Sequence, residues 1–268
     1  MEADQGGGEP GSPAAPSWPN LFDERIARTY DVDSSGMYEP AVLGPTVDFL
    51  ADLAGDGAAL EFAVGTGRVA LALAARGVPV EGIDLSPDML AQLAAKPGAD
   101  AITASVGDMT STRLDRTFRL VYLVYNTIGN VTTQDAQVAC FTNAAAHLEP
   151  GGCFVIEVGV PQLQRLPPGD TAQVFTVTPT RLGFDTLDVA RQLGVSHHYW
   201  FSDGKVVTFT TPWRYAWPAE FDLMARIAGM RLRERWSDWG RQPFTSQSGK
   251  HVSVWEKVAD AEATDVMP

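Results

Sequence analysis

The chain has 268 residues, and its 33 acidic side chains outnumber its 20 basic ones to give a formal net charge of −13. This charge repels phosphate backbones and anionic membranes, so it argues against nucleic acid and membrane surfaces as partners. Cys140 and Cys153 have no metal-ligand spacing, and the sequence shows neither a signal peptide nor a membrane-spanning run. We therefore expect a cytoplasmic protein without a metal site, built as one large domain with an elaboration.

The beginning of the chain combines a tail with a candidate lid. Residues 1–20 are rich in glycine, proline and alanine, which predicts a disordered tail. Residues 21–30 place apolar side chains at helical spacing, and a polar loop follows over 31–40. This segment could cover a ligand as a lid, or Tyr30 and Tyr38 could simply pack on the surface of the domain.

The centre of the sequence is the stretch from Ala59 to Arg68, which reads ALEFAVGTGR. Apolar residues alternate in its first half, which predicts a short buried strand. Gly65 and Gly67 let the backbone turn tightly and approach a ligand closely, and a helix that ends at Gly77 follows. A strand, a glycine turn and a helix in this order are typical of a nucleotide-binding site.

Strands and helices alternate around this stretch. A helix is expected before it, over 41–54, and Ser86 caps another. Thr132 with Asp135 resembles the capping box of a further helix. Such alternation predicts a parallel sheet with helices on both faces. Four more strands of this sheet are expected, over 78–83, 101–105, 118–125 and 153–158.

The pattern changes after Pro161. Three runs rich in Val, Thr and aromatic residues predict an antiparallel insert, with a hairpin turn at 202–204. The expected strands of the insert are 173–178, 186–200 and 205–217. A helix and two strands then close the chain, over 218–228, 230–236 and 251–257.

The glycine turn fits more than one cofactor. The sequence GTGRVA that starts at Gly65 matches the dinucleotide fingerprint, and Asp84 is suitably placed to grip two ribose hydroxyls. However, Glu61 stands four residues before Gly65, where a dehydrogenase strand is usually apolar. Asp108 and Met109 follow the third strand, where they can contact an adenine. Taken singly, Glu61 could be a structural acid and Asp84 a helix cap.

Together these residues resemble the class I S-adenosylmethionine-dependent methyltransferases, over roughly residues 20–258. The resemblance implies an α/β fold with a Rossmann-like seven-stranded sheet, ordered 3-2-1-4-5-7-6 with the last strand antiparallel. It also implies S-adenosyl-L-methionine as cofactor and S-adenosyl-L-homocysteine as product. Ala63 departs from the family by one methyl group, since many members have glycine there. The cofactor-binding residues that follow from the resemblance are Glu61, Gly65, Gly67, Asp84, Asp108, Met109 and Tyr125. Tyr30 and Leu85 are expected to bind the cofactor as well.

The resemblance also suggests how the chain is divided. The lid and the cofactor-binding core occupy residues 21–160, and an antiparallel insert on the substrate side occupies 161–217. Residues 218–258 complete the core. The segments outside these are the tail over 1–20 and a frayed end over 259–268.

The insert is similar to that of bacterial amino-sugar N,N-dimethyltransferases and of glycine/sarcosine-type N-methyltransferases. In the sugar enzymes, the loop after the fourth strand ends in a histidine proposed as the base, and Asn130 stands there in this chain. Asn130 is therefore a candidate for orienting a nucleophile. His197 and His198 are further catalytic candidates, but they point to opposite faces of a strand, so at most one faces the site. Either could also be a surface residue.

Candidate substrate residues come from two places. Asn126 follows the fourth strand, near the expected position of the sulfonium. Trp213 and Tyr215 on the insert could wall a pocket for a ring-bearing substrate or could form a small core. Arg214 could pair with a substrate carboxylate or phosphate, or could form a structural salt bridge.

We therefore expect an S-adenosylmethionine-dependent methyltransferase that acts on N or O of a small-molecule acceptor, either a metabolite or a compound like a natural product. One alternative is an NAD(P)-dependent oxidoreductase. Another is a cofactor-binding protein without turnover, which the absence of an obvious base keeps open. The sequence does not name the acceptor, and it leaves the oligomeric state open, with a homodimer as one option.

Overall fold

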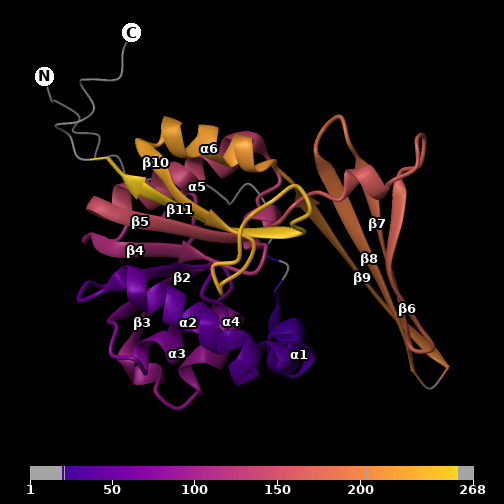
Figure 1. Ribbon diagram of the computed structural model, residues 1–268. Coiled ribbons are helices and arrows are strands. Elements are labelled where there is room, and N and C mark those ends of the chain that lie inside the picture. Colours follow the sequence, from indigo (N-terminus) through magenta and orange to yellow (C-terminus); the bar gives the residue numbers. More distant parts are fainter. Residues whose placement is uncertain (1–19, 21, 203, 259–268) are drawn as a thin grey trace, which may run out of the picture.

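The computed structural model describes residues 20, 22–202 and 204–258. The predicted tails, 1–20 and 259–268, therefore lie outside the described residues except for Asn20. A central sheet of seven strands has the order β10-β11-β5-β4-β1-β2-β3 (Figure 1). Its strands are β1 (Ala59–Phe62), β2 (Val80–Asp84), β3 (Ile102–Val106), β4 (Phe118–Leu123), β5 (Leu148–Gly159), β10 (Met230–Trp236) and β11 (Lys250–Lys257).

The strand directions confirm the predicted sheet. β1 pairs in parallel with β2 and β4, and the parallel arrangement continues to β3 and β5. β11 pairs antiparallel with β5, and β10 antiparallel with β11. Numbered within this sheet alone, the order is the expected 3-2-1-4-5-7-6.

Two apolar layers cover the sheet, because neighbouring side chains along a strand point to opposite faces. Leu60 and Phe62 of β1 pack in the layer that includes α5 (Gln134–His147) and α6 (Pro218–Ile227). Ala59 belongs to the other layer, which includes α2 (Pro40–Ala54) and α3 (Arg68–Ala74). The helices therefore lie on both faces, as the alternating pattern predicts.

Two helices begin at or next to the N-cap residues that the sequence predicts. Ser86 caps α4 (Pro87–Ala94) as expected, since its hydroxyl accepts from the Met89 amide at 3.2 Å. The predicted cap at Thr132 was wrong by one residue: Thr133 has the extended backbone of a cap, and its hydroxyl accepts from the amide of Ala136 at 3.2 Å. Both threonines lie before the same acidic first turn, so the sequence did not separate them.

The insert is a second, antiparallel sheet in the order β6-β7-β8-β9, which extends to one side of the core (Figure 1). Its strands are β6 (Ala172–Thr178), β7 (Arg181–Asp188), β8 (Leu193–Ser202) and β9 (Lys205–Arg214). The sequence predicted three strands, and the run 186–200 in fact contains a turn between β7 and β8. Gln192 makes this turn with a positive φ of 56° and no glycine, so the usual turn signal is missing.

The fifth strand also begins earlier than predicted. The expected hard turn at 149–152 lies inside β5, where the pairing with β4 shifts between Phe118↔Leu148 and Leu120↔Cys153. At the predicted hairpin of the insert, Ser202 pairs with Lys205, while Asp203 lies outside the described residues. None of the helices in the described part of the chain has both the length and the apolar character needed to cross a membrane.

Candidate functional site

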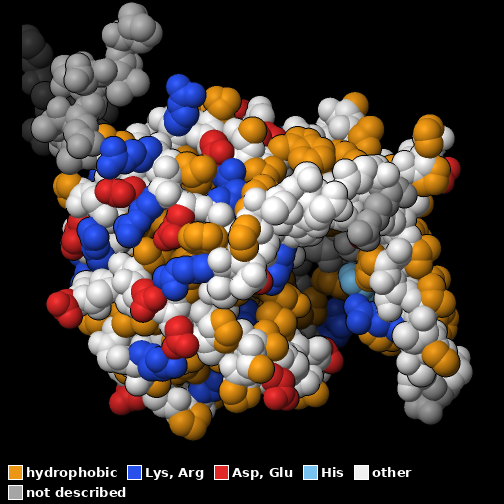
Figure 2. All heavy atoms as spheres, in the orientation of Figure 1, with side chains coloured by type: hydrophobic (Ala, Val, Ile, Leu, Met, Phe, Trp, Pro, Cys, Tyr) orange, Lys and Arg blue, Asp and Glu red, His pale blue; other side chains and the backbone are white. Residues whose placement is uncertain are grey.

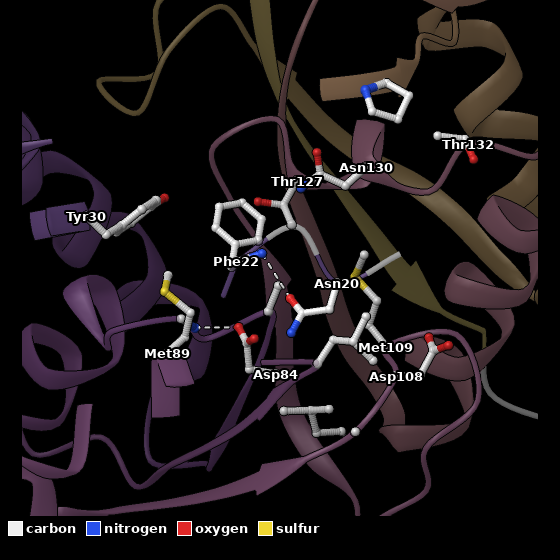
Figure 3. Close-up of a pocket in the computed structure, with 16 residues that line it drawn as sticks. Asn20, Phe22, Tyr30, Asp84, Met89, Asp108, Met109, Thr127, Asn130 and Thr132 are labelled. Atoms are coloured by element: carbon white, nitrogen blue, oxygen red, sulfur yellow. Dashed lines mark hydrogen bonds between the residues drawn. The ribbon is translucent and has the colours of Figure 1, made fainter. Parts of the chain in front are cut away.

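A first pocket opens where β1 to β4 end, at the carboxyl edge of the parallel strands (Figure 3). This edge is where open α/β sheets bind their ligands. The N-terminal helix α1 (Glu24–Asp33) borders the pocket through Tyr30, and β9 of the insert borders it through Pro212. The lining residues are Asn20, Phe22, Tyr30, Ala63, Gly65, Ile83, Asp84, Leu85, Met89, Gly107, Asp108, Met109, Thr127, Asn130, Thr132 and Pro212.

The turn after β1 has the conformation that its glycines predict. Gly65 and Gly67 have φ values of +55° and +80°, and a β-carbon at Gly67 would come within 2.2 Å of Leu93 Cδ1. Ala63 also has a positive φ, 52°, where many family members carry glycine. An L-residue in this region costs roughly 1 kcal/mol, which the chain tolerates at this single alanine.

Asp84 lies at the end of β2 and braces the glycine turn. One carboxylate oxygen accepts from the amide of Gly65 at 2.7 Å (Figure 3). The other accepts from the amide of Ser86 at 2.8 Å. Burial raises the pKa of this carboxyl, although both amide bonds oppose the shift. Each carboxylate oxygen has two lone pairs, so the side chain retains capacity to accept from ribose hydroxyls in the pocket that it lines.

Glu61 is buried beneath the turn and is not among the pocket-lining residues. Its carboxylate accepts from the Tyr122 hydroxyl at 2.9 Å, and a backbone hydrogen bond reaches it from Ala70 in α3. Burial raises the pKa of Glu61 to about 8. The side chain therefore joins β1, β4 and α3 at the base of the turn.

The loop after β3 forms another wall of the pocket. One oxygen of Asp108 accepts from both the amide and the hydroxyl of Thr110, at 2.8 and 2.7 Å. No described residue donates to its second oxygen, which stays available to a donor such as an exocyclic amine. The Asn143 amide holds the loop by donating to the Met109 carbonyl at 2.7 Å. Leu85 lines the same pocket.

Residues of the predicted lid border the pocket. Phe22 and Tyr30 both line it, and their rings pack edge to face with centroids 5.9 Å apart (Figure 3). The Ser86 hydroxyl donates to the Phe22 carbonyl, which ties the start of this segment to the cap of α4. The N-terminal segment thus lies over the pocket that the strand ends form.

A polar clamp holds the end of α1 against the glycine turn. Asp31 accepts from the Thr66 hydroxyl at 2.6 Å and forms an ion pair with Lys96 at 2.5 Å. Tyr38 donates to the same carboxylate, and Lys96 donates to the Thr66 carbonyl at 2.6 Å. The pKa of Asp31 is lowered because these hydrogen bonds and the Lys96 charge outweigh its desolvation, which acts in the opposite direction.

A second pocket lies between the insert and the core, where Figure 2 shows a hollow. It meets the first pocket at Asn130, which lines both and ends the turn η3 (Thr127–Asn130). Consecutive residues of β9 line different pockets: Pro212 lines the first and Trp213 lines the second. The core side of the second pocket includes Tyr125, Asn126, Gly129, Val158, Gly159 and Val160.

The residues after β4 take up unusual backbone conformations. Tyr125 and Asn126 both have φ of 59°, and Tyr125 is 47% exposed. The Arg68 guanidinium lies 5.6 Å from the Tyr125 ring centroid. The Asn126 carbonyl oxygen Oδ1 accepts from the Gly159 amide, so this side chain joins the ends of β4 and β5. Both residues line the second pocket and neither lines the first.

The two histidines of β8 face opposite ways, as their alternation predicts. His198 lines the second pocket, and burial together with the nearby Arg181 charge lowers its pKa. His197 lies on the other face, stacked on Phe184 at 4.7 Å and bonded to the Thr186 hydroxyl at 3.1 Å. This position separates His197 from both pockets.

Arg214 is engaged in a buried network. Its guanidinium forms an ion pair with Glu220 of α6 at 2.6 Å and donates to Gln137 of α5 and Gln192. Of the two roles expected for Arg214, the structure shows the structural salt bridge. Trp213 and Tyr215 line the second pocket beside it.

Several lining residues were not among the predicted site residues. Met89 lines the first pocket and lies in the first turn of α4, after the Ser86 cap. Its closeness in sequence to Asp84 could have indicated that it lines the same pocket. Asp185 and Ser196 line the second pocket. Their position depends on the register between β7 and β8, and the missed turn at Gln192 concealed that register.

Comparisons with known proteins agree with this architecture. Residues 59–152 match the protein family described as a methyltransferase domain. The solved CcbJ methyltransferase from Streptomyces caelestis is 34% identical, with a TM-score of 0.78, and the match covers 89% of this chain and 98% of that one. The cypemycin N-terminal methyltransferase of a Streptomyces species is 28% identical over 250 residues, or 89% of this chain and 98% of the relative.

A further relative matches a shorter stretch. The dTDP-3-amino-3,4,6-trideoxy-alpha-D-glucopyranose N,N-dimethyltransferase of Streptomyces venezuelae is 33% identical over 139 residues, which is 48% of this chain and 58% of that protein. The strand order, the glycine turn and the near-complete match to CcbJ define one class of protein. The chain belongs to the class I S-adenosylmethionine-dependent methyltransferases. It is an enzyme, and its cofactor is S-adenosylmethionine.

Proposed function

We propose that this methyltransferase acts on an amine nitrogen of a small molecule or short peptide that binds in the second pocket. The observation that carries the proposal is the meeting of the two pockets at Asn130. The first pocket has the carboxylates and glycines suited to an adenosyl group, and the second lies between the insert and the core. Methyl transfer needs two reactants held in line at such a junction.

We propose that different lining residues of the first pocket contact different parts of the cofactor. Asp84 accepts from the ribose hydroxyls, and Asp108 accepts from the adenine amine beside Met109. Gly65 lets the backbone approach, while Tyr30 and Phe22 exclude water from above. When bound, the cofactor supplies an electrophilic methyl group on a sulfonium, so the protein mainly binds, orients and desolvates.

Nitrogen is favoured over oxygen by what lines the junction. A hydroxyl nucleophile needs a base to remove its proton, whereas an amine can lose its extra proton to water before it attacks. Asn130, which lines both pockets, carries an amide that cannot act as a base, and Asp84 and Asp108 line the first pocket, where we assign them to the cofactor. His198 lines the second pocket from the insert strand β8. Asn130 can accept from an amine N–H and so orient its lone pair. Two relatives, the cypemycin N-terminal methyltransferase and the amino-sugar N,N-dimethyltransferase, support the same choice.

The proposal is tested by offering the enzyme matched acceptors. Amino sugars and short peptides, together with their hydroxyl analogues, are incubated with methyl-deuterated cofactor, and products are found by mass spectrometry. We expect label on nitrogen of some amines and on none of the alcohols. Label on alcohols alone, or binding of adenosylhomocysteine without transfer to any acceptor, would contradict the proposal.

Asn130 provides the residue-level arm of this test. We expect Asn130→Ala to lower kcat at least tenfold while the affinity for adenosylhomocysteine changes by less than about threefold, roughly 0.7 kcal/mol. The matched control is Thr142→Ala on the exposed side of α5, which should leave both values unchanged. An unaffected kcat in Asn130→Ala would remove this residue from the proposal.

A further inference from the structure

Four polar side chains form a row across the insert sheet. Gln173 pairs with Asp185, Asp185 with Ser196, and Ser196 with Thr211, so one residue from each of the four strands stands in register. Direct partners in an antiparallel sheet present their side chains on the same face. All four line the second pocket, and we call this row the polar ladder.

Apolar and aromatic groups flank the polar ladder on both sides. The next row along the strands contains Leu187 and Trp213, both lining the pocket. On the other side lie Phe175 and His198, with ring centroids 5.3 Å apart. A narrow polar stripe between apolar walls is typical of a pocket that fixes the orientation of a small ligand.

Asp185 gives the polar ladder its charge. Its carboxylate accepts from the Ser196 hydroxyl at 2.6 Å, and Ser196 is the one described side chain that donates to it. Arg214, the other charged side chain lining this pocket besides the titratable His198, is already paired with Glu220. Without a ligand, the negative charge of Asp185 is therefore only partly matched.

Another cation of the same strand is directed elsewhere. Arg181 lies four residues before Asp185 in β7, but its guanidinium stands 5.4 Å from the Trp200 ring centroid and 3.3 Å from His198 Nδ1. It is not among the residues that line the pocket. A half-buried carboxylate with spare lone pairs forms short, charge-assisted hydrogen bonds with a cationic donor such as an ammonium group.

We propose that Asp185 is a specificity-determining residue that binds a protonated amino group of the acceptor against the polar ladder. This inference rests on the proposed function, and it assigns the acceptor to the class of compounds with two amino groups. The nitrogen that is methylated must be neutral to attack, so the ammonium held by Asp185 is a different group of the same molecule. Holding that ammonium would direct the second amine toward Asn130.

The test uses three probes that share one α-amine and differ only at the far end: the amides of lysine, 6-hydroxynorleucine and norleucine. Their binding to the adenosylhomocysteine complex is measured by titration calorimetry, and methyl transfer is measured in parallel with the cofactor. In the wild type we expect lysinamide to bind at least tenfold more tightly than norleucinamide. Asp185→Asn should reduce that preference to less than twofold, and Ser196→Ala should reduce it partially.

The matched control is Asp188→Asn, at the exposed end of the same strand, which should keep the full preference. Unchanged affinity for adenosylhomocysteine in every variant shows that the fold is intact. The inference is overturned if lysinamide binds the wild type no better than norleucinamide, or if Asp185→Asn keeps the preference. Failure of the proposed function has a different signature: no probe or other amine is methylated, whatever the binding preference.

Discussion

At the scale of single residues, Asp84 connects the fold to the cofactor pocket. The same carboxylate that lines the pocket also holds the amides of Gly65 and Ser86. Its position at the end of β2 could be predicted because an acid that ends the strand after a glycine turn is a recurrent feature of ribose-binding sites. The bonds to both turn amides depend on the fold and were not predicted.

Asp84→Ala removes the proposed acceptor for the ribose and loosens the turn, so we expect adenosylhomocysteine to bind at least tenfold more weakly, about 1.4 kcal/mol. Titration calorimetry measures this directly. Asp88→Ala, four residues away in α4 and outside the pocket lining, is the control and should change the affinity less than twofold. Equal affinities for Asp84→Ala and the wild type would refute the ribose role.

Glu61 supports a prediction about pH. Its pKa in the folded protein is raised to about 8 from 4.5, so between these values the folded state holds a proton that the unfolded state has lost. Stability from this group therefore falls as pH rises from about 4.5 to about 8. Glu61→Gln keeps an acceptor for Tyr122 but does not titrate. The melting temperature of this variant should therefore rise relative to that of the wild type as the pH increases across this range.

Thermal unfolding from pH 5 to pH 9 measures the effect. Glu149→Gln, at an exposed position, is the control and should follow the wild-type curve. A constant difference between Glu61→Gln and the wild type at every pH would show that the carboxyl keeps an ordinary pKa in the fold.

Other residues show where sequence reasoning stops. Arg214 was open between a substrate role and a salt bridge, because its partners come from α5, α6 and the turn at Gln192. Asp185 was not singled out at all. Both outcomes depend on contacts between distant segments, which residue type and local spacing do not specify.

At the scale of elements, Arg214 joins the insert to the core. The side chains of Arg214 and Glu220 are only 4% and 18% exposed, so removing one charge leaves the other largely buried. We expect Arg214→Ala to lower the free energy of unfolding by about 3 kcal/mol. Arg76→Ala breaks an exposed ion pair with Asp48 and should cost less than about 1 kcal/mol. Urea unfolding compares the two, and equal losses would show that the buried pair has no special role.

The lid gives a kinetic prediction. Lys96 links Asp31 of α1 to the glycine turn, so Lys96→Met should weaken the clamp while keeping most of the apolar stem. We expect adenosylhomocysteine to dissociate at least threefold faster, as measured by stopped-flow fluorescence. The control is Arg28→Met, which breaks only an exposed pair with Glu24 within α1. Identical dissociation rates in Lys96→Met and the control would show that the clamp does not restrain the lid.

Elements of the core were predicted more closely than those of the insert. β10 (Met230–Trp236) has the predicted limits, because Gly229 ends the helix before it and the polar loop from Ser237 follows it. The run 186–200 was taken as one strand because Gln192 turns the chain without a glycine or proline. A turn made by an ordinary residue at positive φ leaves little trace in the sequence.

At the scale of the whole molecule, two sheets place two pockets side by side. The parallel sheet supplies the first pocket at its carboxyl edge, and the insert supplies the outer wall of the second. The order of the central sheet was predictable through the family resemblance. The meeting of the pockets at Asn130 was not, because it requires the relative position of η3 and β9.

The central claim is that methyl transfer takes place where the two pockets meet, and a crystal structure with adenosylhomocysteine tests it most directly. We predict that the ribose hydroxyls contact Asp84, the adenine lies beside Asp108 and Met109, and the sulfur faces the second pocket next to Asn130. A complex with the sulfur turned away from the second pocket, or with the ligand bound elsewhere, would contradict this account.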